Sequence, residues 1–288
     1  MAVLTQAAHR INDRNLSEQL PRSGNRDELD RLAEVLNAMT ARLHDSFSRI
    51  REFTLHASHE LKTPLTVMHG ELETLLRDDN LPAAQREHLL SQLDEVQRLS
   101  KIVDALTLLT KADAGQIVLA KEPVRLDDLV RDALADARIL AEPHGITVEP
   151  GACDEVTIHG DRHRLRQLLL NLADNAIKYN QPEGRVLISL RATEDQAELV
   201  ISNTGPGIAP EALPRIFDRF YRGDPAHGGS IEGSGLGLSI AQWIVSAHNG
   251  SIRIESAPTK MTTVTVRLPA LRGRTYHDER ALDVSAQL

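Results

Sequence analysis

A histidine in a polar helical context offers the first candidate chemistry, in the stretch HELKTPL that begins at His59. A neutral imidazole is a usable nucleophile near pH 7. Glu60 can hold the Nδ1 proton and leave the Nε2 lone pair free. Thr63 follows one helical turn after His59, where its hydroxyl can orient a water, and Lys62 also points outward because Leu61 and Leu65 belong to the apolar stripe. Taken alone, the pattern also fits an ordinary solvated histidine on a helix.

A second polar group lies in the predicted helix DRHRLRQLLLNLADNAIKYN, which begins at Asp161 as its expected N-cap. Asn171 and Asn175 are four residues apart and so share one face of that helix. Asn175 can offer a carbonyl oxygen to Mg²⁺, which prefers hard oxygen ligands. Lys178 can reach phosphate oxygens, and Tyr179 can pack against a nucleobase or ribose. Without other evidence, two exposed amides would explain the spacing equally well.

A third group, NTGPGI, directly follows a predicted strand. Gly205 and Gly207 would let the backbone approach a ligand closely. Asn203 stands just before them and can accept a hydrogen bond from an adenine amino group. Any glycine-rich surface turn could have the same composition.

A fourth group, GSGLGLS, opens a predicted helix. Glycines at a helix N-terminus present free N–H groups and the positive end of the helix dipole to phosphate. Neither the Walker nor the Rossmann pattern fits, because no Gly-Lys-Ser/Thr follows and no strand directly precedes it. The residues of this group that we consider for binding are Gly233, Gly235, Leu236, Gly237 and Leu238.

The segment between the third and fourth groups, residues 216–233, mixes aromatic residues and glycines with Arg219 and Arg222. Its composition predicts a mobile lid over a nucleotide. A surface loop without that role is the alternative.

The elements that must position these groups begin with helices, since the first hundred residues are rich in Leu, Ala, Glu, Arg and Gln. Apolar residues recur at steps of three and four in residues 26–48 and again in 61–75, where Pro64 should kink the helix. After a break at 78–82, a further stripe covers 89–106, which completes a hairpin. One hairpin cannot bury both of its faces, so we expect a homodimeric four-helix bundle, with a plain coiled-coil spacer as the alternative.

From about Val124 the pattern changes to a mixture of helices and strands. Helices are predicted over 124–145, over 161–180 and over 236–249, the last stopped by Gly250. Alternating stretches predict strands. These strands cover residues 146–150, 155–160, 185–193, 197–205, 250–256 and 262–268. The predicted fold class is therefore α+β and multidomain: a helical hairpin that forms a dimeric four-helix bundle, followed by an α/β sandwich with helices on one face of a mixed sheet.

Composition limits the function further. The 288 residues carry a net charge of −8, so no global basic field favours a nucleic-acid partner. The single cysteine, Cys153, excludes an internal disulfide and a cysteine-based zinc cage, which fits a reducing compartment. The sequence has no apolar stretch of about 18 residues and no signal-peptide core at its N-terminus, so the chain as written is expected to be soluble and cytoplasmic.

In this order, the four groups, together with the segment between the third and the fourth, resemble the five sequence boxes of the sensor histidine kinases of two-component systems. HASHELKTPLT resembles their H-box, NLADNAIKYN their N-box, NTGPGI their G1 box, FDRFYR their F-box and GSGLGLSI their G2 box. Residues 26–48 are similar to the second helix of a HAMP signalling module, and the resemblance extends over about residues 3–269.

The resemblance implies that His59 is the phospho-acceptor and Glu60 its acid–base partner. Lys62 and Thr63 fall in the same motif, and Thr63 would support phosphatase activity toward the partner. That partner is the receiver domain of a response regulator, which takes the phosphoryl group from the histidine on to an aspartate. The ATP-binding domain is expected to swing so that the γ-phosphate lies in line with Nε2 of His59.

The resemblance also implies that the sandwich is a Bergerat-type ATP-binding fold that takes Mg²⁺ and ATP. Asn171 and Asn175 would bind Mg–ATP, with Asn175 on the metal and Lys178 on phosphate. Arg219 and Arg222 would lie near the phosphates. The other residues placed at the nucleotide are Tyr179, Asn203, Gly205, Gly207, Gly233, Gly235, Leu236, Gly237 and Leu238.

The sequence departs from the family at two places. Asn203 stands where the family usually has Asp, and APTKMTTVTVRLP lacks the usual late glycines. A hydrogen bond to a neutral group is weaker than one to a charged group, so we expect weaker ATP binding, which Asn203→Asp should tighten. These departures leave open an ATP-weak pseudokinase that scaffolds a regulator through its bundle. A different Bergerat ATPase, such as a chaperone-like machine, is disfavoured because it would have no H-box.

The expected domains are the C-terminal part of a HAMP module (1–48), the dimerisation and phospho-acceptor hairpin (49–113), a linker (114–121), the ATP-binding domain (122–270) and a flexible tail (271–288). Within the first of these, residues 3–11 would end one helix and 15–26 would form a connector. A HAMP module normally continues from a transmembrane helix. The sequence is therefore interpreted as the cytoplasmic portion of an inner-membrane sensor, whose anchor would precede Met1.

Overall fold

The computed structural model describes residues 20–21, 28–222, 233–258 and 261–271. The chain divides into two compact units, residues 1–118 and 119–288, which we call the helical unit and the sheet unit and describe separately. Several expectations lie outside the described residues. These are the helix over 3–11, most of the connector over 15–26, the middle of the predicted lid at 223–232 and the tail from residue 272 onward.

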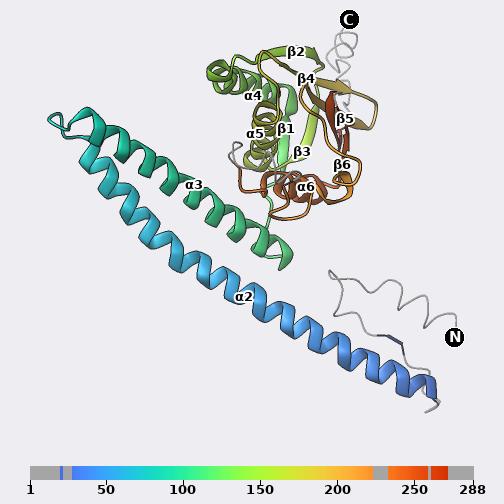
Figure 1. The fold of residues 1–288 in the computed structure, drawn as a ribbon. Coiled ribbons are helices and arrows are strands. Elements are labelled where there is room, and N and C mark those ends of the chain that lie inside the picture. Colours follow the sequence, from blue (N-terminus) through green and yellow to red (C-terminus); the bar gives the residue numbers. More distant parts are fainter. Residues whose placement is uncertain (1–19, 22–27, 223–232, 259–260, 272–288) are drawn as a thin grey trace, which may run out of the picture. The chain divides into compact units, whose positions relative to one another are not determined.

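Two long helices form the helical unit (Figure 1). Helix α2 (Glu28–Leu76) has 49 residues and α3 (Ala83–Asp113) has 31, which confirms the predicted hairpin. Pro64 lies inside α2, and the helix continues through it. None of the described helices combines the length and the apolar character needed to cross a membrane.

The contact between α2 and α3 is a narrow apolar seam. Leu65, Val96 and Val103 are buried in it, and Leu72 packs against them. Many other apolar side chains of these two helices remain exposed. Within the hairpin they include Leu61, Val67, Met68, Leu75, Leu90 and Leu99. One hairpin therefore leaves a large part of its apolar stripes uncovered.

The sheet unit alternates helices and strands. Its elements are β1 (Glu122–Arg125), α4 (Leu126–Ala141), the 3-10 helix η1 (Glu142–His144), β2 (Thr147–Cys153), β3 (Thr157–Gly160), α5 (Arg162–Lys178), β4 (Arg185–Ala192), β5 (Gln196–Asn203), the 3-10 helix η2 (Leu213–Arg215), α6 (Gly237–Ala247), β6 (Ser251–Glu255) and β7 (Thr262–Pro269).

Five of these strands form a mixed sheet in the order β2-β4-β5-β7-β6. Strands β2 and β4 are parallel, while the other neighbours are antiparallel. Along β4 the side chains of Val186, Ile188 and Leu190 are buried and those between them are more open, so one face of the sheet is the covered face. Helices α4, α5 and α6 lie on one side of the sheet in Figure 1, which confirms the predicted α/β sandwich.

Strand β1 was not predicted. The sequence placed a helix from Val124, whereas residues 122–125 pair with β3 and α4 begins at Leu126. The strand has only four residues, includes Pro123 and buries Val124 alone, so it is too short to show an alternating pattern.

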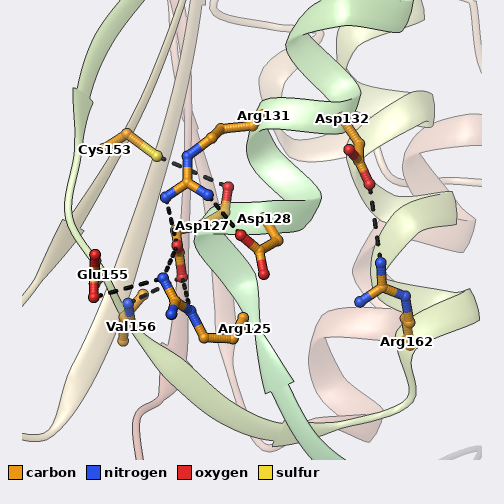
Figure 2. A network of polar contacts seen from close by, with 9 residues as sticks. All are labelled: Arg125, Asp127, Asp128, Arg131, Asp132, Cys153, Glu155, Val156 and Arg162. Carbon is orange, nitrogen blue, oxygen red and sulfur yellow. Dashed lines mark hydrogen bonds and ion pairs between the residues drawn. The ribbon is translucent and has the colours of Figure 1, made fainter.

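A buried carboxylate holds the start of α4 (Figure 2). Asp127 has no exposed side-chain surface and accepts hydrogen bonds from Arg125, Arg131 and the backbone N–H of Val156. The bond from Arg125 is the main reason that the pKa of Asp127 falls to about 2, and the bonds from Val156 and Arg131 act in the same direction against the effect of burial. The network thereby joins β1, α4 and the chain before β3.

The ends of two helices, the start of α5 and the end of α6, were predicted from the sequence. Asp161 caps α5 as predicted, since its Oδ1 accepts a bond from the backbone N–H of Arg164 at 3.1 Å. Gly250 is not the residue that turns the chain at the end of α6. Asn249 takes the left-handed conformation there, with φ 57°. A Cβ on Gly250 would lie 2.4 Å from the carbonyl oxygen of Arg267, so this glycine allows close approach to β7.

Candidate functional site

The residues of the first candidate group lie exposed on α2. His59, Glu60, Lys62 and Thr63 all face solvent, and Thr63 follows His59 by one turn. Within the described residues, the side chains of His59 and Glu60 make no hydrogen bond or ion pair, so they are not bonded to each other. Lys62 Nζ lies 2.7 Å from the carboxylate of Asp104 on α3. The imidazole is therefore free to meet a reactant from solvent.

The second candidate group forms one face of α5, and this face meets the start of α6. The side-chain amide of Asn171 donates to the carbonyl oxygen of Gly237 at 3.5 Å. A Cβ on Gly237 would lie 3.5 Å from Nδ2 of Asn175, and one on Gly233 would lie 4.0 Å from the hydroxyl of Tyr179. The structure thus brings together the amides of α5 and the glycine-rich stretch, as expected from the sequence.

Lys178 lies exposed at the end of α5. Its Nζ is 2.7 Å from the carboxylate of Asp174, one turn earlier on the same helix. Exposed pairs of this kind contribute at most about 1 kcal/mol. The ammonium group can therefore exchange this partner for a phosphate oxygen at small cost.

The start of α6 offers N–H groups without a side-chain cap. Leu236 is the N-cap residue and is fully buried, which anchors the glycine-rich stretch in the core, while Leu238 is half-buried. Ser239 does not cap the helix, because its hydroxyl donates to the carbonyl oxygen of Leu236 at 2.8 Å. The first N–H groups of an 11-residue helix are left for an anion.

The glycine-rich stretch packs against the aromatic segment that precedes it, residues 217–222. Phe220 and Gly235 both have left-handed backbones, with φ 60° and 68°, and the N–H of Phe220 donates to the carbonyl oxygen of Gly235 at 3.1 Å. A Cβ on Gly235 would lie 2.9 Å from backbone atoms of Phe220 and Tyr221, so no larger residue fits. Arg219 and Arg222 are exposed on this segment.

The third candidate group closes the end of β5. Asn203 is 6% exposed, and its Nδ2 donates to the carbonyl oxygens of Tyr179 and Thr204. A Cβ on Gly205 would lie 2.4 Å from the carbonyl oxygen of Tyr179, and one on Gly207, with φ 76°, would lie 2.1 Å from that of Ala257. Both glycines are therefore required by close backbone approaches rather than by a loose turn.

His248, which follows α6, was not predicted as a site residue from the sequence. It is 4% exposed; its Nδ1 lies 2.7 Å from the carbonyl oxygen of Ile244, and its Nε2 accepts the N–H of Asp161 at 2.9 Å. Nδ1 therefore carries the proton, and burial lowers the pKa of this histidine. The ring ties the end of α6 to the start of α5. The sequence shows only a histidine before Asn-Gly, which gives no indication of a partner 87 residues away.

Asp161 has a second partner, because its Oδ2 accepts the backbone N–H of Ala120 at 3.1 Å. Burial alone would raise its pKa, but the bonds from the backbone N–H groups of Arg164 and Ala120 outweigh burial, and the pKa lies below the ordinary value. The carboxylate stays charged and holds the chain before β1 against α5.

The geometry of the sheet unit suits a nucleotide. Helix α5 presents the amides of Asn171 and Asn175, and the start of α6 presents N–H groups that no side chain caps. The glycines beside them leave the backbone accessible to a phosphate or a base. The side-chain oxygen of Asn175 is a fitting donor for a hard cation brought in with phosphates. No reactive carboxylate or thiol is needed for phosphoryl transfer, which depends mainly on positioning and charge neutralisation.

Three protein families match the chain along its length. Residues 1–45 match the HAMP domain, residues 49–115 match the His Kinase A (phospho-acceptor) domain, and residues 160–272 match the histidine kinase-, DNA gyrase B- and HSP90-like ATPases. These matches follow the same order as the candidate groups.

The chain is also similar to whole proteins. It is 35% identical over 246 residues to the signal transduction histidine-protein kinase BaeS of Escherichia coli K12, a match that covers 85% of this chain and 52% of BaeS. It is 35% identical to the signal transduction histidine-protein kinase ArlS of Staphylococcus aureus USA300, over 84% of this chain and 54% of ArlS. The chain thus spans about half the length of these relatives.

Two solved structures are similar in fold. Full-length ShkA in complex with AMPPNP superposes with a TM-score of 0.66 at 28% identity, covering 77% of this chain and 46% of that one. The histidine kinase AdeS of Acinetobacter baumannii superposes with a TM-score of 0.53 at 25% identity, covering 73% of this chain and 97% of AdeS.

Proposed function

The chain belongs to the sensor histidine kinases of two-component systems, and we propose that it transfers a phosphoryl group from Mg–ATP to His59 and then to an aspartate of a response regulator. The observation that carries the proposal is the presence, in one chain, of an exposed histidine on a hairpin helix and a glycine-lined cradle in the sheet unit. The first supplies the acceptor and the second a place for the donor.

In the sheet unit, the residues that would hold the nucleotide divide by chemistry. Asn175 offers an amide oxygen to Mg²⁺, and Asn171 holds the carbonyl of Gly237, which fixes the start of α6 beside it. The N–H groups of that helix start and the ammonium of Lys178 provide positive charge for the phosphates. Arg219 and Arg222 extend that charge from the aromatic segment. Bound Mg–ATP supplies the γ-phosphoryl group.

In the helical unit, His59 provides the acceptor nitrogen. Its exposed ring can present Nε2 once Nδ1 carries the proton, and Glu60 is the neighbouring acid proposed to hold that proton after a change of rotamer. Thr63, one turn away, is placed to orient a water for a separate phosphatase reaction, in which the water takes the phosphoryl group from the partner's phosphoaspartate and releases inorganic phosphate. Lys62 has a structural partner in Asp104 and thereby joins the motif to α3.

We further propose that two copies of the chain form a four-helix bundle through α2 and α3. The exposed apolar side chains of the hairpin support this, since a second hairpin would cover them. The receiver domain of the regulator would dock on the same bundle near His59. The residues that match HAMP would link the hairpin to a membrane-anchored sensor portion, as the family resemblance implies.

Labelling with γ-labelled ATP and Mg²⁺ tests the proposal. The wild-type chain should acquire label that is labile in acid and stable in base, and His59→Gln should abolish it. His56→Gln is the matched control, because His56 lies exposed one turn earlier on α2 and should leave labelling unchanged. A folded wild-type chain that binds ATP and acquires no label would refute the kinase activity.

The alternative, an ATP-weak scaffold, predicts a different result in the same assay. It requires regulator binding without labelling of His59. The matches to both the phospho-acceptor and the ATPase families, together with the intact amides of α5, favour the kinase.

A further inference from the structure

The linker between the two units is held by hydrogen bonds at both of its ends. At the helical end, the N–H of Gln116 donates to the carbonyl oxygen of Lys111 at 2.9 Å, so the chain still belongs to the end of α3 at this point. At the other end, Oδ2 of Asp161 accepts the N–H of Ala120 at 3.1 Å. Residues 117–119 lie between these two attachments, and the boundary between the two units falls inside this segment.

Asp161 is a fixed point of the sheet unit. Its backbone N–H donates to Nε2 of His248 at 2.9 Å, and its carbonyl oxygen accepts the N–H of Leu165 at the same distance. Its Oδ1 accepts the N–H of Arg164 at 3.1 Å. Since the backbone and one carboxylate oxygen are bonded within the unit, the second oxygen points in a defined direction. The bond to Ala120 therefore attaches the linker to a rigid place at the start of α5.

Ala120 lies at the centre of a tight turn. The N–H of Lys121 donates to the carbonyl oxygen of Leu119 at 3.0 Å, which is the bond of a γ-turn. Ala120 does not have a positive φ, so the turn is of the inverse kind, with φ near −75°. The turn does not use the N–H of Ala120, and this N–H is the one that Asp161 accepts.

The bond to Ala120 determines how much of the linker can move. If it opens, the next bonded position along the described chain is Glu122, which pairs with Gly160 in β1 and β3. The free segment then grows from residues 117–119 to residues 117–121. Two further residues add about 7 Å to its greatest reach. A longer tether spreads the sheet unit over more positions relative to the hairpin.

We propose that Asp161 is a positioning residue for phosphoryl transfer to His59, which acts by holding Ala120 and so confining the tether between the units to residues 117–119. The proposal rests on the kinase function proposed above. In-line transfer requires close placement of the γ-phosphate, and a misplacement of about 1 Å can cost a large factor in rate. Asn171 follows Asp161 by about 15 Å along α5, so binding of ATP itself should not depend on this bond.

Two substitutions remove the bond to Ala120 and keep the cap of α5. In Asp161→Asn the side chain has one acceptor oxygen instead of two. Asn caps helices about as well as Asp, so the oxygen should stay with the N–H of Arg164 while the NH₂ group meets the N–H of Ala120, donor to donor. Ala120→Pro leaves the carboxylate intact and removes the other partner. The φ of proline, about −65°, suits the centre of an inverse γ-turn.

Autophosphorylation of the full chain tests the proposal, measured as the initial rate of labelling of His59 over a range of ATP concentrations. Asp161→Asn and Ala120→Pro should each lower kcat by at least about threefold and leave the KM for ATP within about twofold of wild type. The double variant should be no slower than the slower single variant, because both changes remove the same bond. Two independent structural defects would instead multiply.

Asp128→Asn is the matched control, because it removes a charge from an exposed aspartate of α4 and should leave kcat unchanged. Urea unfolding checks the cap, and Asp161→Asn should unfold at a higher urea concentration than Asp161→Ala. Wild-type kcat in either single variant would overturn the positioning role and leave the kinase proposal standing. So would a raised KM with unchanged kcat, or multiplied losses in the double variant. A folded wild-type chain that binds ATP and acquires no label would overturn both proposals.

Discussion

Replacement of Asp127 by Asn is expected to destabilise the sheet unit by about 2–3 kcal/mol at pH 7. The carboxylate has no exposed surface and is bonded to two arginines and a backbone N–H (Figure 2). Its pKa falls from the ordinary 3.8 to about 2, chiefly because of the hydrogen bond from Arg125. Each pKa unit corresponds to about 1.4 kcal/mol of preference for the charged form in the folded state.

The same shift fixes the pH dependence. The folded state holds the charged carboxylate more strongly than the unfolded chain does, so the stabilisation is complete above pH 3.8 and disappears as the pH falls through about 2. The difference in the free energy of unfolding between wild type and Asp127→Asn should therefore shrink over this window. Other carboxylates titrate there as well, which is why the difference between the two proteins is the quantity to compare.

Urea unfolding followed by Trp243 fluorescence measures this effect, because the residue lies in α6 and reports on the sheet unit. Asp128→Asn is the matched control. Asp128 is 48% exposed and, among the described residues, its ion pair is with Arg131, so its loss should cost less than about 1 kcal/mol. Equal effects of the two substitutions, or a difference for Asp127 that stays constant down to pH 2, would refute the reasoning.

Three further predictions concern the elements around the nucleotide site. Asp161→Ala should cost about 1–2 kcal/mol in the same urea assay, because it removes the cap of α5 and the bond to Ala120; a loss below about 0.3 kcal/mol would contradict this role. The buried neutral His248 should make stability fall as the pH drops below 6.5, since the unfolded chain protonates first; His248→Gln should flatten that part of the pH profile, and an unchanged slope would count against it. Gly207→Ala should lower both the unfolding midpoint and ATP affinity, because the added Cβ would meet a carbonyl oxygen at 2.1 Å with φ at 76°; wild-type affinity in calorimetry would show that the turn can relax.

Helices and strands that are buried on one face could be predicted from the sequence, because burial on one face leaves a regular spacing of apolar residues. Both hairpin helices and strands β2 to β7 were predicted in this way, whereas β1 buries only Val124 and shows no alternation. The types of the site residues were also visible. Their partners were not: one of the two carbonyl oxygens that accept from Nδ2 of Asn203 belongs to Tyr179, 24 residues away, and His248 reaches across 87 residues. Backbone carbonyls carry no side-chain signature, so the orientation of an amide can be read only from the folded chain.

Helix α2 joins the HAMP-matching part and His59 in one uninterrupted rod. From Glu28 to His59 it contains neither glycine nor proline, and the first helix-breaking residue is Pro64, just past the histidine. An α-helix advances by about 100° of rotation per residue, so the two ends are in fixed angular phase. Seven added residues would restore that phase to within about 20°, while one or two would turn His59 to another side of the hairpin. The number of residues between the start of α2 and His59 therefore sets the direction in which the histidine faces.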